Sequence, residues 1–141
     1  MVRAPELKAD KIITALEAGD FYASSGVTLA DVIWKNNRLT VRIEAEPGVT
    51  YTTQFIGTRR PVDWRSKPVL GTNGQPLNVT QTYSSGLGAV LAEERGAVAS
   101  FTCKGTELYV RAKVTSSKPV KNPVVTGERE MAWTQPVQPQ K

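Results

Sequence analysis

Three runs of the sequence alternate apolar and polar residues with a period of two, and this pattern constrains the fold more than any other feature. The runs are RLTVRIEA, VTYTTQFI and ELYVRAKVT. Such alternation indicates strands that bury one face and expose the other, as in antiparallel sheets. The side chains expected to face the core are Leu39, Val41, Ile43, Ala45, Val49, Tyr51, Thr53, Phe55, Leu108, Val110, Ala112 and Val114. Those expected to face solvent on the third run are Glu107, Tyr109, Arg111 and Lys113.

Turn signals between the runs indicate tight hairpins. Asn36-Asn37 follows the run DVIWK, and asparagine tolerates the left-handed conformations of a two-residue hairpin turn. Arg95-Gly96 separates AVLAEE from AVASFTC in the same way, whereas LNVTQTY is a weaker strand pattern. Several short strands joined by turns are typical of a sandwich. We therefore predict a mainly β fold: an antiparallel β-sandwich of immunoglobulin-like type with one N-terminal helix.

The segment Pro5 to Ala18 has the spacing of a helix with one apolar stripe. The residues of the stripe are Ala9, Ile12, Ile13 and Leu16. Gly19 follows the last of them, as is common where a helix ends. Because a helix this short is marginal by itself, we expect its stripe to pack against another surface.

The chain length of 141 residues suits one domain with short additions. We expect residues 1–27 to form a helix and strand at the junction with another domain, residues 28–117 to form the sandwich, and residues 118–141 to form a tail. Trp133 predicts that part of this proline-containing tail docks on the sandwich. Residues 57–76 are rich in Pro, Gly and Arg and are expected to form a long loop, with GTNGQP as a turn.

The composition excludes several kinds of active site. The sequence has no histidine, which removes Ser-His-Asp and Cys-His catalysis and the usual zinc sites. Its single cysteine, Cys103, lies in an apolar run and is expected to be a buried structural thiol. We assign no catalytic residue, no metal ligand and no cofactor to the chain. No apolar run is long enough to cross a bilayer, so no membrane partner is expected.

The formal net charge of +5 permits contact with acidic partners without requiring it, and we do not expect a nucleic-acid partner. Arg59, Arg60, Arg65 and Lys67 surround Trp64 in the long loop. Guanidinium groups beside an indole are typical of an anion or sugar site, and these residues are the candidate ligand contacts. Alternatively, the loop is solvated and its tryptophan contacts the end of the sandwich or a neighbouring domain.

Four phrases of the sequence, taken together, resemble a known family. They are ALEAGDFYASSGV, LTVRIEAEPGVTYTTQFIGTR, ELYVRAKVTSSKP and MAWTQPV. They resemble the C-terminal portion of bacterial metal-dependent hydrolases of the polymerase and histidinol phosphatase (PHP) superfamily. The resemblance covers most of the chain and is weakest from about Pro61 to Val90. None of the four phrases carries a catalytic group.

The resemblance implies that residues 5 to 27 join this chain to a preceding distorted (β/α) barrel of the same polypeptide. In that family the barrel holds the divalent metals through ligands that are mainly histidines, and this chain has none. The implied role is a noncatalytic C-terminal accessory domain of a phosphoesterase or related hydrolase. The sequence leaves open the cellular location of the complete hydrolase, for which the periplasm and secretion are the two locations considered. A free-standing module that binds glycans or polyanions, and a domain for self-association, remain alternatives.

Overall fold

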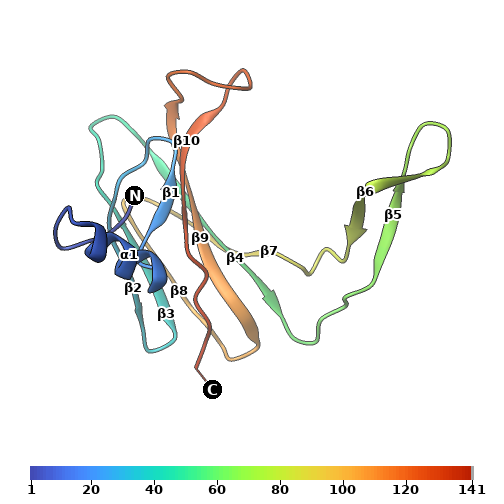
Figure 1. Cartoon of the computed structure of the whole chain (residues 1–141), viewed down its shortest axis with the longest axis horizontal. Coiled ribbons are helices and arrows are strands. Elements are labelled where there is room, and N and C mark those ends of the chain that lie inside the picture. Colours follow the sequence, from blue (N-terminus) through green and yellow to red (C-terminus); the bar gives the residue numbers. More distant parts are fainter. Residues whose placement is uncertain (141) are drawn as a thin grey trace.

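The computed structural model describes residues 1–140, except for the side chain of Val79. Within residues 1–140 there are one helix and ten strands, whose arrangement is drawn in Figure 1. In chain order these are α1 (Ala9–Glu17), β1 (Tyr22–Ser24), β2 (Leu29–Lys35), β3 (Arg38–Ile43), β4 (Tyr51–Arg59), β5 (Ser66–Leu70), β6 (Pro76–Tyr83), β7 (Ala89–Arg95), β8 (Val98–Thr102), β9 (Glu107–Pro119) and β10 (Arg129–Thr134).

The strands form three antiparallel sheets. One has the order β1-β10-β9-β4-β7, the second β2-β3-β8, and the third contains only β5 and β6. The first two sheets pack face to face as a sandwich, which confirms the predicted mainly β, antiparallel fold with one helix (Figure 1). The five-stranded sheet crosses the boundaries expected after residues 27 and 117, because β10 lies between β1 and β9. Trp133 of β10 is half-buried, so this part of the tail does dock.

The core between the two sheets comes from the alternating runs. Buried, inward-facing side chains include Leu39, Val41, Ile43, Tyr51, Thr53, Phe55, Val110, Ala112 and Val114. The rings of Phe55 and Phe101 stack across the sandwich with centroids 5.6 Å apart. Burial of a large apolar side chain contributes about 1.5–3 kcal/mol, so these strands supply much of the stability. Ala45 was expected in this set and is exposed, because β3 ends at Ile43.

Glu107 is a second correction to the expected pattern. It was expected to face solvent, but it is 5% exposed. The pairing of β4 with β9 shifts register between Thr58 and Arg59, which places Glu107 opposite Arg59. The reason for its burial is therefore an ion pair, which the apolar periodicity of β9 does not encode.

The helix is shorter than expected. It begins at Ala9 rather than Pro5, since Lys8 is still extended and no side chain caps the first turn. It ends as predicted, with Gly19 in the left-handed region at φ 72°. The amide of Asp20 then donates to the carbonyl of Ala15 at 2.8 Å, which closes the turn into β1.

Residues 57–76 do not form one loop. β4 continues to Arg59, and Ser66–Leu70 forms β5, which pairs with β6 around a turn at Gly74. Residues 60–88 thus form a two-stranded arm that projects away from the sandwich (Figure 1). The arm and α1 lie on opposite sides of the molecule (Figure 1).

Candidate functional site

The candidate ligand contacts lie at the base of the arm, and one of them, Arg59, forms an ion pair within the protein. Arg59 is the last residue of β4, and its Nε donates to Oε1 of Glu107 at 3.1 Å. The other carboxylate oxygen of Glu107 accepts from the amide of Lys104 at 2.9 Å. The Glu107 side chain is fully buried, whereas that of Arg59 is 45% exposed. The Nε of Arg59 therefore holds β4 to β9 at the base of the arm, while about half of its side chain stays exposed.

The ionisation of Glu107 follows from these contacts. Burial opposes the charged form, but hydrogen bonds from its own backbone amide, from Arg59 and from the Lys104 amide outweigh burial. Together they lower the pKa of Glu107 below its ordinary value. The carboxylate and guanidinium thus form a charged pair at the point where the arm leaves the sandwich.

The other candidate residues lie along the first part of the arm. Arg65 pairs with Asp63 through two hydrogen bonds, at 2.8 Å and 2.9 Å. The hydrogen bond from the Arg65 side chain lowers the pKa of the exposed Asp63 carboxyl. Trp64 is 68% exposed, and Arg60 is exposed with no ion pair among the described residues. Of the three predicted arginines, Arg60 alone is therefore without a carboxylate partner within residues 1–140.

A polar hollow lies beside these residues, at the foot of β5 and β6. It is lined by Asp63, Arg65, Ser66, Lys67, Thr82, Tyr83 and Ser84. Trp64 does not line it, so the structure does not bring the indole and all the cations to one place. Hydroxyl groups, one carboxylate and two cations can hydrogen-bond a polar ligand, and the Tyr83 ring offers a flat apolar surface.

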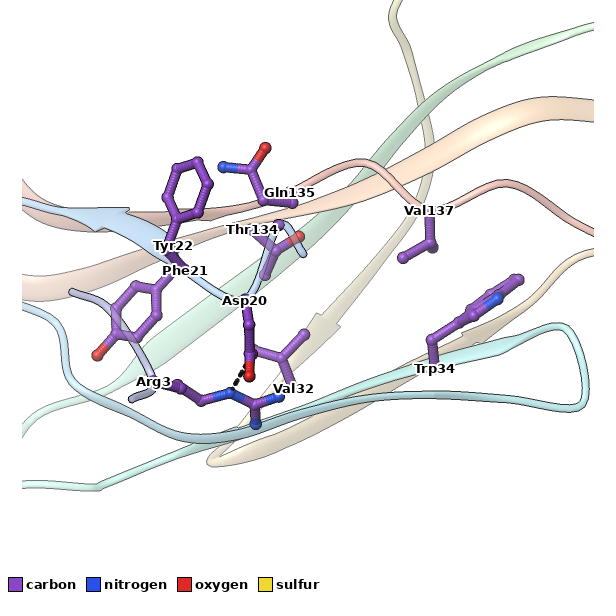
Figure 2. A pocket seen from close by; sticks show the side chains of 10 residues that line it. Arg3, Asp20, Phe21, Tyr22, Val32, Trp34, Thr134, Gln135 and Val137 are labelled. Atoms are coloured by element: carbon purple, nitrogen blue, oxygen red, sulfur yellow. Dashed lines mark hydrogen bonds and ion pairs between the residues drawn. The ribbon is translucent and has the colours of Figure 1, made fainter. Parts of the chain in front are cut away.

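A second cavity, missed by the sequence reasoning, lies where the edge strands β1 and β2 of the two larger sheets approach each other. Its volume is about 130 Å³. Figure 2 shows Trp34 and Val137 near each other at one end and the Arg3–Asp20 pair near Val32. Ligand pockets usually measure about 300–1,000 Å³, so this cavity fits at most a single side chain or a very small molecule.

Arg3 closes one side of this cavity. Its guanidinium donates to Asp20 at 2.6 Å and to Asp31 at 2.7 Å. The hydrogen bond with Asp20 is the main cause that raises the pKa of Arg3 above its ordinary value. These side chains are about 40% exposed, so the pairs add little stability, but they hold the N-terminal segment, the turn before β1 and β2 together. Nothing in the spacing of three such distant residues signals the contact.

The exposed apolar side of α1 is the third feature. Ala15 is the buried residue of the helix, whereas Ile13 is 54% and Leu16 44% exposed. Just before the helix, Leu7 is 94% exposed. The stripe that was expected to be covered is therefore largely bare in this chain.

Reactive groups are few within residues 1–140. Cys103 is buried as expected, and burial followed by the nearby charge of Glu107 raises its pKa to about 11. Among the described residues, no three acidic, cysteine or histidine side chains gather where they could hold a metal ion. The helix described here lacks the length and apolar content needed to cross a membrane.

Comparison of the chain with protein-family models, with curated proteins and with solved structures finds no match.

Proposed function

We propose that this chain is a noncatalytic C-terminal accessory domain of a metal-dependent hydrolase similar to the PHP superfamily. In this proposal the catalytic barrel precedes the chain in the same polypeptide and supplies the divalent metals. The sandwich stabilises the barrel or helps to select its substrate. The proposal begins from the resemblance of the four sequence phrases, and one structural observation supports it.

That observation is the bare apolar side of α1. Apolar surface is exposed on this side of the molecule at Leu7, Ile13 and Leu16. Because a short helix is marginal by itself, α1 needs a surface that covers it. The residues that line the small cavity from Gly19 to Tyr22 directly follow this helix. A preceding domain would reach this surface first, because the N-terminal residues lead into it (Figure 1).

The first test is to sequence the coding DNA upstream of the Met1 codon. We expect the reading frame to continue into a segment with the histidines of a metal-binding barrel. The purified chain of 141 residues should show no hydrolysis of phosphoesters with added manganese or zinc. A stop codon and ribosome-binding site directly upstream, or metal-dependent turnover by the chain alone, would refute the proposal.

A free-standing module for glycans or polyanions is the second candidate, favoured by the polar hollow at the foot of the arm. Its test is retention on immobilised glycan and heparin columns. If it is correct, the double variant Lys67→Ala, Tyr83→Ala, which removes two side chains that line the hollow, elutes earlier than the unchanged chain. A polyanion would be released as salt rises, whereas a neutral sugar would not. Identical elution of both proteins on both columns would exclude this function.

A further inference from the structure

The arm is a ribbon of two strands with no layer packed on either face. β5 and β6 form a sheet of their own, and every residue of β5 except the half-buried Val69 is exposed. An isolated two-stranded hairpin is at best marginally stable in water. The arm therefore has the geometry of an element that becomes stable when it pairs with something else.

The charge distribution along the arm indicates what kind of surface it meets. From Pro68 to Gly88 the sequence contains no Asp, Glu, Lys or Arg, although 22% of the whole chain is charged. Leu70, Leu77 and Tyr83 are 58%, 45% and 57% exposed in this uncharged stretch. The centres of protein–protein interfaces are depleted of charge and enriched in aromatic residues, so the outer arm resembles an interface rather than an ordinary surface.

The two edges of the ribbon differ. β5 carries Lys67 and Pro68, and lysine and proline are residues that natural edge strands use to prevent pairing. After its first residue, Pro76, β6 has the sequence LNVTQTY, without charge or proline. Its threonines favour strand pairing. The free edge of β6 is therefore open to another strand.

We propose that β6 pairs antiparallel with β6 of a second copy of this chain. The two-fold axis would lie near Thr80, the middle residue of the run from Leu77 to Tyr83. The result is one four-stranded sheet in which each β6 lies inside and each β5 outside. Such a two-fold interface uses the same surface on both subunits, as most homodimers do.

Charge favours a second copy as the occupant of this edge. All charged residues of the arm lie at its base, where Arg60 and Lys67 have no ion-pair partner among the described residues. Antiparallel pairing places the positively charged ends of the two arms at opposite ends of the joint sheet, so these ends do not repel each other. The two uncharged β6 strands then lie side by side, with the outer end of each beside the inner end of the other.

The position of the arm also agrees with this dimer. The arm lies on the side opposite α1, so the dimer leaves the bare helix face free (Figure 1). The proposal is therefore independent of the accessory role, and either can fail without the other.

The test is sedimentation of the purified chain, whose mass is 15.4 kDa, over a range of micromolar concentrations. We expect a reversible dimer. Thr80→Lys places two like charges opposite each other at the axis and should raise the dimer dissociation constant by about tenfold or more. Thr72→Lys adds the same charge in the turn at the end of the arm and should leave the dimer intact.

Cross-linking locates the axis. Thr80 is exposed, and a residue at an antiparallel axis faces its own copy with Cβ atoms about 4.5–5.5 Å apart. Thr80→Cys should therefore form a disulfide-linked dimer under mild oxidation, whereas Thr72→Cys should not. The buried Cys103 should not contribute in the unchanged chain. A monomer at every concentration, a dimer insensitive to Thr80→Lys, or equal cross-linking of both cysteine variants would overturn the proposal.

Discussion

At the scale of single residues, Glu107 links the arm to the sandwich and gives the first prediction. Its pKa is lowered in the folded protein, so its contribution is complete above the ordinary glutamate pKa of about 4.3 and disappears as pH falls through the lowered value. Glu107→Gln should lower the free energy of unfolding by about 1–2 kcal/mol at pH 7, since it weakens hydrogen bonds to a charged group.

The measurement is urea unfolding of both proteins at neutral and acidic pH. The difference between them should shrink towards zero as the pH falls below the folded-state pKa. Glu44→Gln, at an exposed position, should match the unchanged chain throughout. A difference for Glu107→Gln that is the same at every pH would mean that the charge has no part in it.

Two threonines of β4 give a matched prediction. Both are buried, but Thr53 Oγ1 has no hydrogen-bond partner among the described residues, whereas Thr58 Oγ1 accepts from the amide of Gly88 at 3.0 Å. Replacing an unpaired buried hydroxyl by a methyl group removes a desolvation penalty of about 1–3 kcal/mol. Thr53→Val should therefore raise the melting temperature, and Thr58→Val should lower it. Equal shifts in thermal unfolding would contradict this explanation.

At the same scale, sequence reasoning succeeds where the cause is local. The left-handed conformations of Asn36 and Asn37, with φ of 51° and 56°, follow from what asparagine tolerates in a tight turn. The role of Arg59 could not be predicted, because its partner Glu107 is 48 residues away in the chain. The sequence pattern around a basic residue is the same whether that residue binds a ligand or a distant carboxylate of the protein.

At the scale of elements, the exposed side of α1 leads to a prediction about dye binding. The double variant Ile13→Asp, Leu16→Asp should reduce the fluorescence of a bound hydrophobic dye, because it removes the apolar surface. It should lower the melting temperature only modestly, since Ile13 and Leu16 are already 54% and 44% exposed. Thr14→Asp, on an exposed position of the same helix, is the control. A large loss of thermal stability in the double variant would show that the face is already covered in solution.

The strands show what periodicity can and cannot predict. Alternation identified β3, β4 and β9 because each buries one face in the same core. It could not place β6, whose pattern is compatible with a sandwich strand but which lies in the arm. Whether a strand joins the sandwich depends on contacts between residues far apart in the sequence. For the same reason the position of β10 between β1 and β9 was beyond prediction.

At the scale of the whole molecule, the chain presents two different surfaces on opposite sides (Figure 1). One is the apolar face of α1, which we assign to a preceding domain of the same polypeptide. The other is the uncharged arm, which we assign to a second copy. The sandwich between them holds the two surfaces apart. If both proposals hold, two copies of the complete polypeptide pair through their arms while each α1 contacts its own preceding domain.

The measurement that tests the accessory role most directly is amide hydrogen exchange of α1 in the complete polypeptide and in this chain alone. If a preceding domain covers the helix, the amides of Ala9–Glu17 exchange more slowly in the complete polypeptide, because opening the helix then requires loss of that contact. The amides of β9, which lies in the core of the sandwich, should exchange alike in both and provide the reference. Equal exchange of α1 in the two proteins would contradict the proposal that this chain docks on a catalytic barrel through its helix.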